Sequence, residues 1–314
     1  MDIKTKKEFL IRSLESEAVT TAVGGSLNIN PTIWERRLRD YQRQNLVFAE
    51  LAELQDFRGP GAELKVTIDE APDAANDLVE TTDVSIEEFA TRQVTHDPTE
   101  YGAAYQLTKK EARRSFFDIA DRMVNKLGYA TAIKKDKLAA DVLYDAATET
   151  VYAGLADDRA AMVTAETALD LKALLKARRA INKNLYVPRY FVGTWDQEAD
   201  MLNITGIQSA ADFGGSEAIR RGVVGQVFGV VLIAADSADA SAEDGKVSRG
   251  LMLGTTKTGE KCFGYGVKSD LAIETQYHAR GRYWDIVADE EYDFVAYHPK
   301  AIVVVESFNT MYSS

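Results

Sequence analysis

The sequence has few of the residues on which disulfides, metal sites and membrane segments depend. It contains one cysteine, Cys262, and three histidines in 314 residues. A single cysteine excludes a disulfide within the chain and fits a reducing compartment. No run approaches the roughly 18 apolar residues of a membrane-spanning helix, and the first residues lack the basic and then apolar pattern of a secretory signal. We therefore expect a soluble, cytoplasmic protein that associates with itself.

Basic residues are scarce relative to acidic ones. The chain has 37 Lys and Arg against 49 Asp and Glu, which gives a formal net charge of −12. A general nucleic-acid binder draws its affinity from Lys and Arg that neutralise phosphates, so this class is disfavoured. The acidic excess favours solubility at high concentration instead. The length allows one large domain or two ordinary ones.

Motifs of catalysis and metal binding are also lacking. His96, His278 and His298 lie far apart, and none has a partner at the spacing of a metal-binding helix or zinc finger. There is no Gly-x-Ser-x-Gly motif and no phosphate-binding Gly-Lys-Ser/Thr loop, and Cys262 has no nearby histidine. Acidic pairs such as Glu290-Glu291 are typical of a solvated surface. We predict no catalytic, cofactor-binding or metal-binding residues, with a site built from distant carboxylates as the alternative.

A long amphipathic segment from Thr108 to about Thr148 is the clearest feature that is present. A helix of this length would extend about 60 Å, and Thr108 and Glu111 fit a capping box at its start. Apolar residues recur at helical spacing, namely Ala112, Phe116, Ile119, Met123, Leu127 and Ala130, and again Leu138, Val142 and Ala146. We expect the polar gap at Lys134–Lys137 to face solvent or an adjoining subunit, beyond the helix's own sheet. Gly128 is where we expect any bend.

A long hairpin is predicted before this helix. Residues 63–68 alternate between polar and apolar, and a second strand is expected from about Val84 to Val94. The tip between them, residues 71–83, is polar and acidic. Because such a hairpin is poorly stable alone, we expect it to lie on the body or on a neighbouring chain.

The N-terminal region is predicted to be an extended arm followed by a helix. Residues 20–30 are small and polar, and Asn30-Pro31 is typical of a helix start. This helix has an apolar side and a basic side with Arg36, Arg37, Arg39 and Arg43. Such a side could contact nucleic acid, but we favour a solvated or subunit-pairing face.

The segment after the long helix predicts a separate α/β region. A turn-rich connector is expected at residues 150–158, a helix capped by Thr167–Asp170, a strand at 190–192 and a helix at 195–202. Residues 222–233 have glycines spaced along an aliphatic strand. Their spacing does not fit a dinucleotide-binding motif, which also needs a turn from strand to helix.

The last third of the chain is predicted to be mostly β structure. Residues 236–245 form an acidic loop that lacks the EF-hand pattern, so we expect a solvated turn. A hairpin is expected at residues 250–266 around Thr258-Gly259. Alternating apolar residues from Leu271 to Val305 predict an antiparallel region that closes the fold.

The order of these elements resembles the major capsid proteins of tailed bacteriophages with the Hong Kong phage (lambdoid) capsid fold. Two local patterns support the resemblance. Residues 220–233 are similar to the basic, glycine-punctuated strand of the axial domain, and residues 299–307 are similar to a common ending of these proteins. Among these families the chain looks closest to the phage N4-like group.

The resemblance implies an α+β fold with five regions. These are an N-terminal arm and helix at residues 1–45, an extended loop hairpin at 46–100, a peripheral domain with its long spine helix at 101–163, an axial domain at 164–268, and a closing β-sheet of the peripheral domain at 269–314. Residues 271–307 would thus complete the peripheral sheet.

The resemblance also implies a function and partners. The protein would be a major capsid protein that assembles, as hexamers and pentamers, into the icosahedral shell around the double-stranded DNA of a tailed virus. Its partners would be a separate scaffolding protein, a portal, and DNA bound without sequence specificity, with no membrane and no cofactor. We expect assembly in the host cytoplasm, no enzymatic activity, no cleavage of a leading segment and no isopeptide cross-links. The alternatives are an encapsulin-type compartment shell and an α+β enzyme.

Overall fold

The structure is a computed structural model that describes residues 46–309 except 59, 60, 62, 71–90, 115–118, 155, 166, 204–225 and 239–244. Contacts divide the chain into two units, Met1–Arg39 and Asp40–Ser314, and all described residues lie in the second. The predicted arm and its arginine-rich helix lie outside the described residues. No helix in the described ranges is long and apolar enough to cross a membrane.

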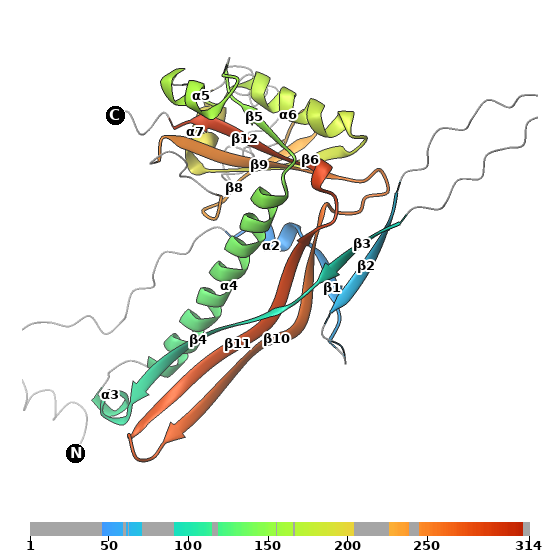
Figure 1. The fold of residues 1–314 in the computed structure, drawn as a ribbon. Coiled ribbons are helices and arrows are strands. Elements are labelled where there is room, and N and C mark those ends of the chain that lie inside the picture. Colours follow the sequence, from blue (N-terminus) through green and yellow to red (C-terminus); the bar gives the residue numbers. More distant parts are fainter. Residues whose placement is uncertain are drawn as a thin grey trace, which may run out of the picture. The chain divides into compact units, whose positions relative to one another are not determined.

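A four-stranded sheet has the order β1-β10-β11-β4 (Figure 1). Its strands are β1 (Glu53–Asp56), β10 (Phe263–His278), β11 (Tyr283–Ala296) and β4 (Thr99–Thr108). β10 and β11 form a long antiparallel hairpin, and β4 pairs antiparallel with β11 along its whole length. β1 runs parallel to β10 but reaches only its first residues, up to Val267.

The helix α4 (Ile119–Ala146) lies along one face of this sheet (Figure 1). Leu127 packs with Ile286 and Ala288 of β11, because strand residues two apart point to the same face. A shorter helix, α3 (Lys109–Arg114), precedes α4. The predicted start is confirmed: Glu111 N donates to Thr108 Oγ1 at 3.2 Å, and Thr108 N donates to Glu111 Oε2 at 3.2 Å. The continuity of α3 and α4 falls on residues outside the described ranges.

A six-stranded sheet has the order β5-β12-β9-β6-β8-β7. Its strands are β5 (Glu149–Tyr152), β12 (Ile302–Phe308), β9 (Val247–Thr255), β6 (Val187–Gly193), β8 (Val230–Ala234) and β7 (Gln226–Val227). The helices of this part are α5 (Arg159–Ala165), α6 (Leu171–Lys183) and α7 (Trp195–Leu202), with a short 3-10 helix η1 at Pro299–Ala301. α6 covers one face of the sheet, and its buried Ala177 and Ile181 lie in one cluster with Phe191 and Met252.

A second apolar cluster joins the two sheets. It combines Leu143 of α4 and Phe48 of the short helix α2 (Phe48–Leu51) with side chains of both sheets, including Leu251, Phe263, Tyr292 and Ile302. The C-terminal half of α4 thus packs into the core from which both sheets extend.

The predicted hairpin is confirmed for the described residues. β2 (Leu64–Asp69) pairs antiparallel with β3 (Thr91–His96), from Leu64 opposite His96 to Asp69 opposite Thr91. The two strands form a separate two-stranded sheet. The predicted part from Val84 to Ala90 and the tip lie outside the described residues.

Four predictions about the second half of the chain are wrong in part. The turn-rich connector contains the strand β5, and the glycine-spaced strand is broken by a tight turn in which Phe228 (φ 52°) and Gly229 (φ 79°) are left-handed. The turn at Thr256–Glu260 exists, but it joins β9 of one sheet to β10 of the other. β12 joins the six-stranded sheet, so residues 271–307 do not complete a single sheet.

The polar gap of the long helix was also placed wrongly. Lys134 and Lys137 are exposed, but Asp136 is fully buried and Lys135 is half-buried. The partners that allow this burial come from residues 49, 237 and 290, which a local pattern cannot reveal. Ala112 and Ala130, expected on the apolar stripe, are exposed.

Candidate functional site

The three histidines have separate surroundings. His96 ends β3, Nε2 of His278 lies 2.8 Å from Asp285 Oδ2, and Nδ1 of His298 lies 3.3 Å from the Tyr186 hydroxyl. Within the described ranges, no group of three or more His, Cys, Asp or Glu could hold a metal ion. The prediction that no metal-binding or catalytic residues are present stays a prediction.

Cys262 and a small hollow offer no chemistry at neutral pH. Burial raises the pKa of the Cys262 thiol to about 12, so it stays protonated and unreactive. The hollow beside α6 is lined by Arg178, Phe228, Met252 and three aliphatic side chains and has a volume of about 10 Å³. This is about the space of one water molecule, too little for a metabolite.

A buried cluster fixes the base of the β2–β3 hairpin to the body. His96 has no exposed surface, its Nε2 lies 2.8 Å from the Tyr297 hydroxyl, and its Nδ1 lies 3.7 Å from Asp293 Oδ2. Asp293 also accepts a hydrogen bond from the backbone of Asp97 at 3.1 Å. Arg92 of β3 donates to the carbonyl of Tyr297.

The cluster is tightly packed, and burial shifts the pKa values of its titratable side chains. A Cβ at Gly266 would lie 2.8 Å from His96 Nδ1, so a glycine is required there. Burial lowers the pKa of His96, and burial raises the pKa of Asp293 and of Tyr297. The imidazole is therefore neutral at pH 7, and the Tyr297 hydroxyl is protonated.

A second cluster lies at the middle of α4, in the predicted polar gap. Lys135 Nζ lies 2.7 Å from Glu290 Oε2 and over the rings of Tyr292 and Tyr265, at 5.0 and 5.2 Å. Burial lowers the pKa of Lys135, but its bonds to Glu290 and Tyr265 raise it by more, so the ammonium stays charged. The ion pair thus holds α4 against β11.

Asp136 connects α4 to two other segments. Its Oδ1 accepts a hydrogen bond from Ala49 N at 3.0 Å, and its Oδ2 accepts one from the Ser237 hydroxyl. Ala49 lies in α2, and Ser237 follows β8. One carboxylate therefore joins the start of the described chain, the long helix and the six-stranded sheet.

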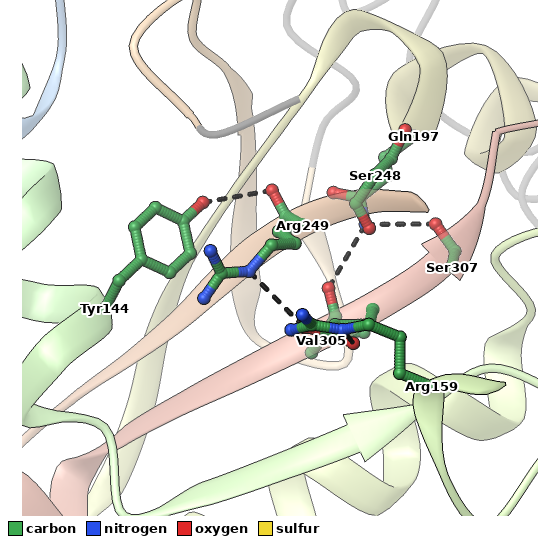
Figure 2. Close-up of polar contacts among 8 residues, drawn as sticks. Tyr144, Arg159, Gln197, Ser248, Arg249, Val305 and Ser307 are labelled. Atoms are coloured by element: carbon green, nitrogen blue, oxygen red, sulfur yellow. Dashed lines mark hydrogen bonds and ion pairs between the residues drawn. The ribbon is translucent and has the colours of Figure 1, made fainter. Parts of the chain in front are cut away.

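A third cluster crosses the six-stranded sheet (Figure 2). The carboxylate of Glu306 in β12 is buried, with Arg159 Nε at 2.9 Å and Arg249 Nε at 3.3 Å. The Arg249 guanidinium lies 4.4 Å from the centre of the Tyr144 ring, and the Tyr144 hydroxyl donates to the Arg249 carbonyl at 3.0 Å. Because Tyr144 belongs to α4, this cluster joins the helix to the sheet.

Gln197 of α7 satisfies the backbone next to it. Its Nε2 lies within hydrogen-bond distance of the carbonyls of Ser248 and Val305 and of the Ser307 hydroxyl, at 3.1 to 3.2 Å (Figure 2). Its side-chain oxygen faces the backbone of Thr194 in a capping box at the start of α7. These polar groups hold elements together, as the two clusters on α4 do.

The described surface has many large apolar side chains. They are exposed by 39 to 68% and comprise Leu54, Tyr105, Leu175, Leu185, Trp195, Leu202, Phe228, Leu271, Ile273, Tyr277 and Val287. The most exposed, Leu185, has a left-handed backbone (φ 67°), which is uncommon for a residue other than glycine. Exposed apolar side chains scattered over many elements are normal on a protein surface, so they do not by themselves mark an interface.

Comparisons with known proteins identify what kind of protein has this architecture. Residues 91–305, more than half of the chain, match the phage capsid protein family. The chain belongs to this family. It is a major capsid protein and a component of the virion shell, which it forms by self-association.

Solved capsid structures confirm the fold of this capsid protein. A structure described as Mycobacterium phage Che8 is 17% identical with a TM-score of 0.68, covering 90% of this chain and 98% of that one. The capsid of cyanophage P-SCSP1u is 16% identical with a TM-score of 0.69, covering 95% of each chain. The head of Helicobacter pylori bacteriophage KHP40 is 12% identical with a TM-score of 0.70, covering 93% and 99%. A search of curated proteins gives no match.

The predicted α+β capsid fold of the Hong Kong phage type is thus confirmed, as is the structural role in the shell. The sequence patterns did not predict the buried polar clusters of this capsid protein. One signal was available: Glu306 interrupts an otherwise apolar strand, and Lys135 and Asp136 interrupt an apolar helical stripe. A charge inside an apolar pattern indicates a buried, compensated group, since an unpaired one would be too costly.

Proposed function

We propose that this capsid protein assembles as hexamers and pentamers into a shell around double-stranded DNA, which it contacts without sequence specificity. A separate scaffolding protein and a portal take part, assembly occurs in the host cytoplasm, and the subunit catalyses no reaction. We also propose that the chain is a member of the phage N4-like group. The net charge of −12 supports weak contact with DNA, because tight binding would need many Lys and Arg at the phosphates.

The observation that carries the proposal is the β2–β3 hairpin, which side chains of β3 attach to the body but which shares no sheet with it. Among the described strands, β2 pairs only with β3, and β3 only with β2. A two-stranded hairpin is marginally stable in water. The subunit therefore has an element that needs a neighbour, and several such weak contacts per copy add up in a closed shell.

We propose the division of the chain that the resemblance implies, with one adjustment. The arm and helix are residues 1–45, the extended loop 46–100, the peripheral domain 101–163 with 269–314, and the axial domain 164–268. β5 and β12 pair within the six-stranded sheet. We therefore assign both strands to the axial side and keep α4 with the four-stranded sheet as the peripheral core.

Electron microscopy of the purified chain tests the proposal. The chain is expressed with and without a candidate scaffolding protein and viewed by negative stain, and we expect closed shells in at least one condition. A variant in which residues 70–90 are replaced by a short Gly-Ser linker is the matched control. We expect it to fold, by circular dichroism, but to form no shells. A wild-type chain that stays a small monomer under all conditions would contradict the proposal.

A further inference from the structure

Both connections of the β2–β3 hairpin to the body pass one buried histidine. His96, the last residue of β3, has no exposed surface. The ring of Phe57, on the connection from β1 to β2, lies 6.3 Å from the His96 ring, centre to centre. Asp97, on the connection to β4, donates its backbone N–H to Asp293 Oδ2, the oxygen that faces His96 Nδ1. A change at His96 therefore acts on both connections at once.

The body surrounds this imidazole closely. Its Nε2 lies 2.8 Å from the Tyr297 hydroxyl, and a Cβ at Gly266 of β10 would lie 2.8 Å from its Nδ1. A Cβ at Gly264 would collide with the Tyr297 hydroxyl, so this group too is packed against the backbone of β10. The packing leaves no room for water beside either ring. The imidazole can therefore become hydrated only by leaving its site.

The charged groups around His96 would compensate a proton only in part. The nearest carboxylate oxygen, Oδ2 of Asp293, lies 3.7 Å from Nδ1, which is beyond hydrogen-bond distance. Nδ1 has no hydrogen-bond partner among the described residues. Arg92 is a cation of the same strand that donates to the carbonyl of Tyr297. The other charged groups lie beyond these residues: Asp97 beside Asp293, Glu53 beside Tyr297 and Lys268 over the Phe57 ring. An imidazolium would thus be buried with one incomplete ion pair, which is unfavourable.

A proton on the imidazole would also disturb its hydrogen bond with Tyr297. A neutral imidazole has one N–H, and we assign it to Nδ1, because the Asp293 carboxylate can only accept. Nε2 then accepts from the Tyr297 hydroxyl, which keeps its hydrogen because burial raises its pKa. After protonation, Nε2 would also have a hydrogen, and the hydroxyl would have to turn its own away from the ring. Protonation therefore adds a buried charge and removes the bond that Tyr297 donates.

We propose that His96 is a pH-sensitive latch for the β2–β3 hairpin: the neutral imidazole holds the base of the hairpin closed against Tyr297 and Asp293, and protonation opens it. The inference goes beyond the proposed function, because the latch acts within one subunit and requires no shell. In the open state the ring meets water, where a histidine titrates at about pH 6.5. While the closed state predominates, the open population should therefore rise about tenfold from pH 7.5 to pH 5.5.

Hydrogen exchange of the free subunit, measured by mass spectrometry at pH 7.5 and pH 5.5, tests the latch. Labelling times are scaled for the intrinsic pH dependence of amide exchange, so that the remaining change reports opening. We expect the peptide that contains residues 91–98 to exchange about tenfold faster at pH 5.5, and the buried strand β9 to be unchanged. His96→Gln cannot gain a proton, so this variant should exchange equally at both pH values. No change in wild type, or the same pH effect in folded His96→Gln, would overturn the proposal.

Two further variants separate His96 from its neighbours. His298→Gln is the matched control, because His298 directly follows Tyr297 but faces the Tyr186 hydroxyl, at 3.3 Å. We expect this variant to keep the tenfold change, and its loss there would assign the pH effect to His298 instead. Tyr297→Phe removes the hydrogen bond alone, so opening at pH 7.5 should rise about threefold to tenfold while a pH effect persists. Circular dichroism of each variant confirms that it is folded.

A measurement on the wild-type subunit decides the question if His96→Gln does not fold. Exchange of the imidazole C2 hydrogen, followed by mass spectrometry over a range of pH, gives the titration midpoint of each histidine. We expect a midpoint for His96 clearly below about 6.5, and a midpoint at or above this value would overturn the proposal. Neither measurement depends on shell formation. Failure of the latch therefore leaves the proposed function standing, and a wild-type chain that forms no shells would contradict the proposed function alone.

Discussion

Individual polar residues hold the subunit together at the places where its elements meet. Glu306 is buried with Arg159 and Arg249, and Lys135 is paired with Glu290. Breaking such a buried pair by removing one partner costs about 3–5 kcal/mol, since the other charge is left uncompensated. The intact pairs contribute little net stability, because both charges had to leave water, but the loss of either partner is costly.

His96 makes the hairpin base sensitive to pH. Burial lowers its pKa in the folded state, whereas the unfolded chain titrates at about 6.5. Below about pH 6.5 the unfolded state therefore takes up a proton that the folded state resists, and stability falls until the folded pKa is passed. Burial also lowers the pKa of His298, so this residue likewise lowers the stability of the folded state as the pH falls. The raised pKa of Asp293 has the opposite effect at lower pH, where it raises the stability of the folded state as the pH falls.

We predict that His96→Gln reduces the loss of stability between about pH 7.5 and pH 5.5. The measurement is urea unfolding of the unassembled subunit at several pH values, followed by fluorescence. Unfolding at pH 8, where His96 is neutral in both states, gives the packing cost of the substitution separately. An unchanged pH dependence in the variant would show that His96 does not titrate on unfolding.

At the scale of elements, α4 is the part that both sheets share. Leu127 packs on the four-stranded sheet, Leu143 lies in the core between the sheets, and Tyr144 contacts Arg249 of the six-stranded sheet. The charged turn that interrupts its apolar stripe lies between these environments. The side chains of this turn that point inward form polar contacts, because other elements cover the helix there on more than one side.

We predict that Asp136→Asn loosens α2. The substitution replaces one acceptor oxygen by a donor that faces either Ala49 N–H or the Ser237 hydroxyl, at a cost of about 1–3 kcal/mol. Hydrogen exchange measured by mass spectrometry should show faster exchange in the peptide that contains residues 48–51. Asp141→Asn, exposed on the same helix, is the control and should leave this peptide unchanged. Equal exchange in both variants would contradict the assigned role of Asp136.

At the scale of the whole molecule, the subunit combines a six-stranded sheet that has its own apolar cluster with a hairpin that forms a separate two-stranded sheet. The six-stranded sheet is covered by α6 and has a continuous apolar cluster. β2 has only half-buried and exposed residues in strict alternation, and its sole described partner is β3. Its backbone bonds are therefore expected to open easily in the free subunit.

We predict that the amides of β2 exchange rapidly in the free subunit and at least tenfold more slowly in the assembled shell. The reason is that assembly would cover a hairpin that the subunit leaves open. Hydrogen exchange is compared between the two forms, with the buried strand β9 as an internal reference that is slow in both. Slow exchange of β2 in the free subunit would mean that the hairpin needs no neighbour.

Local pattern in the sequence determined the elements whose signals are local. The capping box of Thr108 and Glu111, the helix α7 and the alternation of β2 were predicted because caps and periodicity depend on residues a few positions apart. The capsid fold followed from the order of such elements and its resemblance to a known family. The acidic balance, too, is a property of composition alone.

Only the tertiary structure decided which strands share a sheet and which charges are buried. β12 pairs with β9 and β5. β10 follows β9 in the chain but belongs to the other sheet, because strand pairing depends on partners far along the chain. Asp136 is buried since Ala49 and Ser237, which lie 87 and 101 positions away, supply its hydrogen bonds. A sequence pattern shows that a residue is charged, but its burial is set by the free energy of contacts that form only when distant segments meet.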